Sequence, residues 1–327
     1  MRARRIRRAA AVACVFGVAG WTGSEGPAAD AKQLNGFDLS NAAIPIEEIL
    51  PGGPPRDGIP ALSHPRFVAA ADAPWNDQDM VVGVVHEGEA RAYPLAILVW
   101  HELVNDRIAD RPILVSYCPL CGSAIVFDRR PAGAGGRDGK PLEFGVSGLL
   151  YQSDLLMFDR ETDTLWSQIA GRAVAGPMTG GHLEILRARI LPWGSWRARH
   201  PRTRVLSPDT GARRAYGRTP YPGYDRSREL YFPVDADRRY HPKMRTVGLR
   251  MPSGKSRAYP QQEVEAAGSL VEEAFAGRRV VVAWNAQAEA FEVEAPPEVV
   301  VIESFWFAWM AFHPESSVYR AERAERP

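Results

Sequence analysis

Two cysteines separated by two residues are the side chains of this sequence best suited to chemistry. Cys118 and Cys121 lie in the segment Tyr-Cys-Pro-Leu-Cys-Gly-Ser at residues 117–123. Thiolates bind soft metal ions, and in other settings they act as redox-active nucleophiles. The pair therefore has three candidate roles: a metal site, a thiol–disulfide redox site, or a purely structural pair.

The residues around the pair favour the metal site. The apolar, β-branched residues that follow Gly122 predict a strand, whereas redox thiols of the thioredoxin type lie at the N-terminus of a helix. Gly122 tolerates a positive φ, which lets backbone N–H groups point at thiolates, and Pro119 fixes the bend. A disulfide across so short a loop would add little stability. We therefore predict a copper or zinc ion, both of which bind thiolates.

Two cysteines supply only two ligands, and two histidines are the candidates to complete the site. His101 lies in a predicted helix at residues 95–105, on the same face as Asn105 four residues later. His313 ends the aromatic run at residues 305–312, which has helical spacing. An imidazole among apolar rings needs a polar partner. We therefore predict that His101 and His313 are ligands or support the ligands.

Asp154 is the candidate catalytic residue. It ends a cluster at residues 147–154 that mixes polar and apolar side chains, where a carboxylate can orient a ligand or act as a base. The simpler interpretation of Asp154 is a residue that caps a turn. The motifs of phosphate-binding loops, of serine hydrolase elbows and of zinc protease helices are absent from the sequence.

A tyrosine- and proline-rich stretch at residues 212–233 gives a third functional hypothesis. It has neither helical nor strand periodicity, and long irregular loops of this kind are frequently functional. Tyr216, Tyr221 and Tyr224 would then contact a ligand, and the cysteines would be structural. The three hypotheses are thus a metal-binding protein or metalloenzyme, a thiol–disulfide oxidoreductase, and a ligand-binding module.

The elements that must position these residues are mostly strands. Apolar β-rich runs predict strands at residues 80–86, 90–93, 111–117 and 124–127. A similar layout recurs about 165 residues later, where Val-Gly, Arg-Ala-Tyr-Pro and an apolar strand follow in the same order. We therefore predict an α+β, β-rich fold of two related halves formed by internal duplication, packed as one body with an inserted hairpin and loop. Its parts are a first repeat at about 79–130, an insert at about 142–245, a second repeat at about 246–295 and an aromatic segment at 303–314.

Composition narrows the class of protein. The chain has 327 residues, is 45% hydrophobic and carries a formal net charge of +1. These values indicate a globular chain without the basic field of a nucleic-acid-binding protein. Three cysteines are too few for a disulfide scaffold. We expect one domain at residues 32–327 whose partner is a small molecule or a metal ion.

The first 31 residues have the pattern of a signal peptide. Five arginines precede an apolar run at residues 9–20, which is too short to span a bilayer, and small residues follow it. We expect export to the periplasm or the cell exterior, by either the general or the twin-arginine route, and no lipid anchor at Cys14. No later segment has the length and hydropathy of a membrane span, so we do not expect an integral membrane protein.

Several longer motifs resemble those of a known family. They are Ala-Tyr-Pro at 92–94, Trp-His-Glu at 100–102, the cysteine segment at 117–122, the polar cluster at 147–154, Leu-Trp-Ser-Gln at 165–168 and the aromatic run at 305–314. Together they resemble the bacterial and archaeal exported proteins of the domain of unknown function 3179 family, over about residues 40–320. This resemblance implies shared domain boundaries and no particular reaction.

Overall fold

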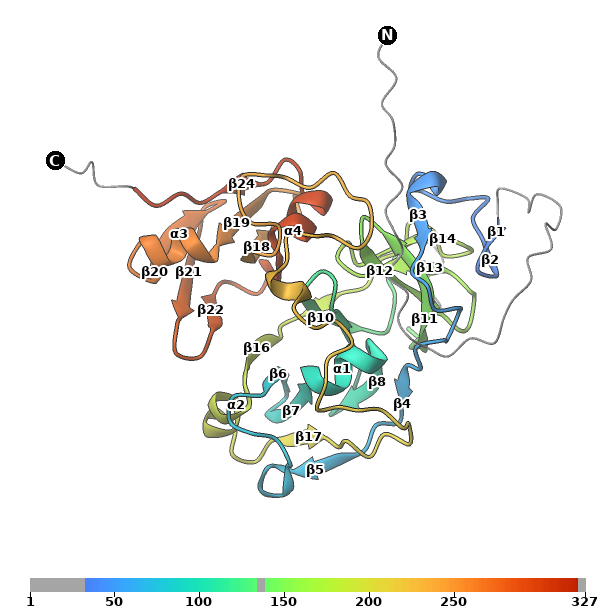
Figure 1. Cartoon of the computed structure of the whole chain (residues 1–327), viewed down its shortest axis with the longest axis horizontal. Coiled ribbons are helices and arrows are strands. Elements are labelled where there is room, and N and C mark those ends of the chain that lie inside the picture. Colours follow the sequence, from blue (N-terminus) through green and yellow to red (C-terminus); the bar gives the residue numbers. More distant parts are fainter. Residues whose placement is uncertain (1–32, 134–138, 323–327) are drawn as a thin grey trace, which may run out of the picture. The chain divides into compact units, whose positions relative to one another are not determined.

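The computed structural model describes residues 33–133 and 139–322, which lie in one compact unit, Lys32–Pro327 (Figure 1). Strands dominate it, and its helices are one or two turns long, so the predicted β-rich class is confirmed. No helix among the described residues has the length and apolar character needed to cross a bilayer. The predicted signal peptide and Cys14 lie outside the described residues.

Five sheets of three to five strands are arranged as a five-bladed propeller. Two of them form the site described below, and we name them the thiol sheet and the carboxylate sheet. The thiol sheet has the strand order β15 (Ile185–Leu186), β10 (Ser123–Asp128), β9 (Arg111–Cys118), β8 (Leu103–Ile108) and β4 (Leu62–Ser63). The carboxylate sheet has the strand order β14 (Arg172–Ala175), β13 (Leu165–Ser167), β12 (Asp154–Asp159), β11 (Phe144–Tyr151) and β3 (Ile49–Pro51).

The other three sheets form the remaining blades of the propeller. One runs β16 (Arg189–Pro192), β6 (Met80–His86), β7 (Glu89–Pro94), β17 (Arg204–Leu206) and β5 (Phe67–Ala69). The second runs β23 (Val300–Phe305), β18 (Arg245–Arg250), β19 (Ser256–Pro260) and β24 (Ser317–Val318), and the third runs β20 (Leu270–Phe275), β21 (Arg278–Asn285) and β22 (Ala290–Glu294). A separate hairpin pairs β1 (Gln33–Leu34) with β2 (Phe37–Asp38). The helices are α1 (Leu95–His101), α2 (Trp193–Arg199), α3 (Gln261–Ala266) and α4 (Trp306–Phe312), with short 3₁₀ turns at η1 (Ile46–Glu48), η2 (Ala70–Asp72) and η3 (Tyr224–Arg226).

The predicted helix at residues 95–105 is too long. Helix α1 ends at His101, and Glu102 then adopts a φ of 58°, which turns the chain out of the helix. Strand β8 follows at once, because Leu103 and Val104 are apolar and buried on both sides of a sheet. Asn105 therefore lies on a strand, and the predicted shared helical face of His101 and Asn105 is wrong.

Two tryptophans pack on two glycines in closely similar ways. A Cβ atom added to Gly83 would lie 2.3 Å from the ring of Trp196, and one added to Gly248 would lie 2.1 Å from the ring of Trp309. Only a residue without a side chain fits under each indole. Each indole N–H donates to a hydroxyl seven residues later, at 2.9 Å and 3.0 Å. Each indole also packs on a histidine four residues later, at a ring distance of 4.1 Å.

The same two regions share a second set of contacts. The buried hydroxyl of Tyr93 donates to Asp106 at 2.6 Å, and that of Tyr259 donates to Glu273 at 2.5 Å. An arginine two residues before each tyrosine binds the same carboxylate. Strands β7 and β19, which carry the tyrosines, each have a parallel neighbour, β17 and β24 respectively. These regions thus place equivalent side chains in equivalent contacts.

The segment between β17 and β18 has little regular structure, as its sequence predicts. Its sole helical turn among the described residues is η3. From residue 208 to residue 239 every side chain is exposed or half-buried except that of Tyr224. Tyr224 is thus the single residue between positions 208 and 239 that is buried in the protein interior.

Candidate metal centre

The described part of the chain contains one group of at least three potential metal ligands, formed by Cys118, Cys121 and Asp154. One ligand atom from each residue lies within 4.8 Å of the others. The three residues are 2%, 0% and 0% exposed, so the group lies beneath the protein surface. Both cysteines are free thiols. The sequence named all three residues, but it did not show that the carboxylate would join the thiols.

The cysteines lie at the turn that joins β9 to β10. These strands pair antiparallel, and Cys118 stands opposite Ser123. The N–H of Cys121 donates to the carbonyl of Cys118 at 3.2 Å, which closes the turn. Gly122 has a φ of +59°, and a Cβ there would lie 2.8 Å from the ring of Phe305, so both its conformation and its surroundings require glycine. The strand after the cysteines confirms the prediction that they do not begin a helix.

Asp154 comes from the turn that joins β11 to β12. The two turn residues, Gln152 and Ser153, have φ values of 52° and 65°, as a type I′ hairpin requires. The thiol of Cys121 donates to the carbonyl of Ser153 at 3.3 Å, which fixes this turn beside the cysteine turn. The N–H of Ile169 donates to Oδ2 of Asp154 at 3.0 Å and so fixes the orientation of the carboxylate.

A buried glutamine connects the two sheets next to the thiols. Gln168 is fully buried, and its Oε1 accepts a hydrogen bond of 2.8 Å from the hydroxyl of Ser123. Its Nε2 donates to Ser116 Oγ at 3.0 Å and to the Ser123 carbonyl at 3.2 Å. Every polar atom of the side chain is therefore engaged, which holds the cysteine turn against the carboxylate sheet.

Burial makes the charged forms of the acidic groups unfavourable. It raises the pKa of Asp154 to about 7, and the N–H groups of Ile169 and Leu155 together with the nearby thiols only partly offset this. Burial, assisted by the charge of Asp154, raises the pKa of Glu102 to about 8. Burial also raises the pKa of the Cys121 thiol, with contributions from Cys118 and Asp154. Asp154, Glu102 and Cys121 therefore lose their protons at higher pH than they would in water.

These acids have no protein cation beside them. Among residues 33–133 and 139–322, no lysine or arginine nitrogen lies within 4 Å of the carboxylate of Asp154 or of Glu102. Two other buried acids do have such a partner: Asp106 binds Arg91 at 2.6 Å, and Asp128 binds Arg111 at 2.8 Å. A bound metal cation would supply the missing positive charge.

The structure places His101 in a different network. Its Nδ1 donates to the Pro60 carbonyl at 2.7 Å, since a carbonyl can only accept. Its Nε2 then accepts from the hydroxyl of Tyr216, also at 2.7 Å. Both ring nitrogens are occupied, so His101 has no lone pair free for a metal ion and instead anchors the segment that carries Tyr216.

His313 also lies outside the group of ligands. It follows α4, and its ring packs on Trp309, while burial lowers its pKa to about 4. Its Nε2 is buried and has no hydrogen-bond partner among the described residues. The geometry therefore brings Asp154 to the thiols and gives no support to a ligand role for His101 or His313.

Two further residues belong to the surroundings of the thiols. Glu102, at the end of α1, is 8% exposed and interacts with Asp154 as described above. Tyr224 belongs to the same hydrophobic cluster as both cysteines and is 3% exposed. Burial raises the pKa of its hydroxyl, and the charges of Cys121 and Cys118 raise it further. The sequence drew attention to Tyr224 only as part of a tyrosine-rich loop, and it gave Glu102 no role.

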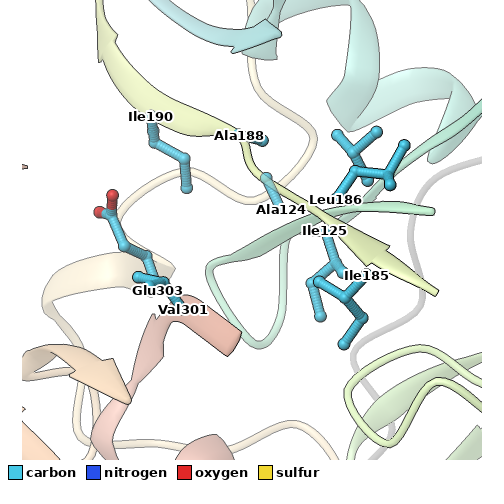
Figure 2. Close-up of a pocket in the computed structure, with 9 residues that line it drawn as sticks. Ala124, Ile125, Ile185, Leu186, Ala188, Ile190, Val301 and Glu303 are labelled. Atoms are coloured by element: carbon cyan, nitrogen blue, oxygen red, sulfur yellow. The ribbon is translucent and has the colours of Figure 1, made fainter. Parts of the chain in front are cut away.

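Two cavities elsewhere on the protein differ from this site. One of about 20 Å³ lies between β10, β15 and β23, with apolar side chains around it and the carboxylate of Glu303 at one side (Figure 2). It has room for a single water molecule but not for a substrate. The other, of about 670 Å³, is an open depression lined by Arg257, Glu273 and their neighbours. Neither is lined by a cysteine.

Comparisons with known proteins place the chain in a family without giving it an activity. A family model described as "Protein of unknown function (DUF3179)" matches residues 56–296, a range that includes the two cysteines and Asp154. Neither the curated proteins nor the solved structures contain a match. The matched range covers most of the chain, and the family expected from the sequence is confirmed. The protein therefore belongs to the DUF3179 family of proteins of unknown function.

Proposed function

We propose that the protein binds a zinc or copper ion through Cys118, Cys121 and Asp154. The observation that carries this proposal is the convergence of two thiols and a carboxylate, all buried, within 4.8 Å and without a protein cation. Thiolate ligands suit both ions, whereas the hard carboxylate oxygen favours zinc over Cu(I). We therefore regard zinc as the first candidate and copper as the second.

Three protein ligands suggest a metalloenzyme rather than a structural metal site. Structural zinc sites use four protein ligands, while catalytic sites use three and leave the fourth position to water or substrate. At such a position the metal would polarise a bound molecule. Glu102, whose pKa of about 8 lies near neutral pH, would then be the acid or base nearest the site.

The test is metal analysis of the protein purified from its native compartment. Wild-type protein is expected to carry close to one equivalent of zinc or copper, and the double variant C118S/C121S none. The matched control is E303Q, because Glu303 is a half-buried carboxyl whose pKa is also raised to about 7, but it lines the small cavity and is not one of the three potential metal ligands. A double variant with unchanged metal content would refute the proposal, as would wild-type protein without metal after purification and reconstitution.

The thiol–disulfide oxidoreductase is the second hypothesis, and one observation supports it. The two free sulfur atoms lie within 4.8 Å of each other, so a disulfide needs only a small movement. Against it stand the burial and raised pKa of Cys121, because redox thiols are activated by a lowered pKa. A reversible two-electron titration of the pair in metal-free protein would support this hypothesis over the first.

The ligand-binding module, with structural cysteines, is the third hypothesis. Of its three tyrosines, Tyr216 is engaged with His101, Tyr221 packs near Tyr231, and Tyr224 lies at the thiols. Tyr221 and Tyr224 thus share a contact with Tyr231, whereas Tyr216 lies in a different network with His101. What supports a ligand is the inward position of Tyr224 alone, which is consistent with the metal site.

We also infer that the protein is exported and that its two regions of equivalent contacts arose by duplication. Export is supported by the pattern of residues 1–31 and is tested by N-terminal sequencing of protein from its native compartment, which is expected to start close to residue 32. Duplication is supported by the paired tryptophan, glycine and tyrosine contacts. The carboxylate sheet that supplies Asp154 would then be an insertion into the first copy.

A further inference from the structure

Three buried oxygen atoms beside the thiols lack hydrogen-bond partners. They are Oγ of Ser153, Oδ1 of Asp154 and the hydroxyl of Tyr224, and their residues are 1%, 0% and 3% exposed. Among the described residues, these are the only buried side-chain oxygens without a partner, and the other six such atoms are nitrogens. An unsatisfied buried polar group destabilises a folded protein, so three of them on residues that adjoin the thiols indicate that something binds there.

The structure holds Tyr224 firmly in this position. It lies in η3, and Nζ of Lys243 sits 3.9 Å from the centre of its ring. The same Nζ donates to the carbonyls of Ser227 and Glu229, at 2.6 Å and 2.5 Å, just after η3. The ammonium group of Lys243 thus contacts both the ring of Tyr224 and the backbone just after η3, while the hydroxyl of Tyr224 has no partner.

A metal ion bound as proposed above would satisfy only one of these oxygens. Oδ1 of Asp154 is a metal ligand of an ordinary kind, but the neutral hydroxyls of serine and tyrosine are not among the usual ligands of zinc. A hydroxyl can both donate and accept a hydrogen bond. The hydroxyls of Ser153 and Tyr224 can therefore contact a small molecule that occupies the fourth coordination position of the metal.

We propose that Tyr224 and Ser153 bind, through their hydroxyl groups, a small oxygen or nitrogen donor at the fourth coordination position of the metal. This inference rests on the proposed metal site, and it adds the chemical class of the small molecule that binds there. The burial of all these side chains restricts the ligand to a few atoms, such as water, a small anion or the reacting end of a larger molecule. Tyr224 is then a residue that touches the reacting ligand, supplied by a segment far from both cysteines in the sequence.

The test uses full-length protein in which Co(II) replaces the native metal, with azide as the probe. Visible absorption of Co(II) reports both the sulfur ligands and the binding of azide. Y224F is expected to bind one equivalent of Co(II) with unchanged sulfur-to-metal bands and to bind azide at least about tenfold more weakly, the effect of losing one hydrogen bond to a bound ligand. Y231F is the matched control, because Tyr231 packs on Tyr224 at 4.5 Å but is 40% exposed, and its azide affinity is expected to equal that of the wild type.

A second variant protects the test against misfolding of the first. S153A removes the other hydroxyl with a minimal change in size, and it is expected to weaken azide binding in the same direction. Equal azide affinity in Y224F, S153A and wild type would overturn the inference and leave the metal site standing, as would cobalt protein that binds no azide. Absence of stoichiometric Co(II) in the wild type would overturn both proposals.

Discussion

The thiol of Cys121 donates a hydrogen bond of 3.3 Å to the carbonyl of Ser153, the residue before Asp154. This contact joins a turn of the thiol sheet to a turn of the carboxylate sheet. Both turns need unusual backbone conformations, with positive φ at Gly122 on one side and at Gln152 and Ser153 on the other. Strained turns that face each other around buried acids are typical of functional sites.

Replacement of Asp154 by asparagine is expected to weaken metal binding by at least about tenfold, or about 1.4 kcal/mol, because an anionic ligand is lost from a site that has no other charge partner. Competition with a chelator of known affinity measures the effect. D159N is a useful comparison, since Asp159 is equally buried but bonds to Trp166 and Thr162. Equal metal affinity in D154N and wild type would remove Asp154 from the site.

Ionisation of Asp154 and Glu102 is expected to lower the stability of the metal-free protein as the pH rises, against the opposite contribution of the histidines whose pKa values burial lowers. The pKa values of Asp154 and Glu102 are raised in the folded protein, to about 7 and about 8, from ordinary values near 4 when unfolded. The folded state therefore holds protons that the unfolded state releases, and the free energy of unfolding decreases between about pH 4 and about pH 8. Thermal unfolding across this range checks the trend. D154N lacks one of the two acids, so its stability relative to the wild type is expected to increase with pH over this range, and a difference that stays constant or decreases would contradict the raised pKa of Asp154.

Metal uptake is expected to release protons near neutral pH. The thiols and the protonated part of Asp154 must ionise to bind a cation. Calorimetric titration with zinc in buffers of different ionisation enthalpy gives the number of protons released. A heat of binding that does not change with the buffer would show that the ligands are already ionised before the metal binds. This would contradict the raised pKa values of Cys121 and Asp154.

Truncation of Gln168 to alanine is expected to lower the free energy of unfolding by about 1–3 kcal/mol, because it leaves the buried hydroxyl of Ser123 without its partner. Denaturant unfolding of the metal-free protein measures this loss. Q152A is the control, since the side chain of Gln152 bonds to the exposed Glu48 on the surface. Equal stability of Q168A and wild type would mean that the glutamine does not hold the two sheets together.

Alanine at Gly83 or at Gly248 is expected to destabilise the fold by about 1–3 kcal/mol or more, since each new methyl group would overlap an indole ring. If the two regions are copies, the two losses will be similar. G217A is the control, because a Cβ there meets no atom within 4 Å. Tolerance of alanine at one glycine but not at the other would argue against equivalent packing.

The sequence predicted the strands well and the helices less well. Strand β6 was predicted with its observed bounds, and β9 and β10 within one residue at each end, because apolar β-branched runs have few alternatives. Helix α1 was extended too far, since a positive φ at a glutamate has no signal in a single sequence. The five-bladed arrangement of sheets depends on pairings between distant strands, such as β17 with β7, which local patterns do not encode.

For the site, residue type identified the thiols and the carboxylate, but their partners depended on the fold. The histidines were attractive because they stand among apolar residues, yet His101 satisfies both ring nitrogens through Pro60 and Tyr216, which are distant in sequence. Tyr224 could be singled out from the other tyrosines only by its burial. The sequence thus indicated which types of residue could form a site, but only the fold showed which of them lie together.

X-ray absorption spectroscopy at the metal edge of the purified full-length protein tests the central claim most directly. Two sulfur ligands are expected, at about 2.3 Å if the metal is zinc, together with at least one oxygen ligand at about 2.0–2.2 Å. Both sulfur contributions are expected to disappear in C118S/C121S. A metal surrounded only by nitrogen and oxygen in the wild type would contradict the claim that Cys118, Cys121 and Asp154 form a metal centre.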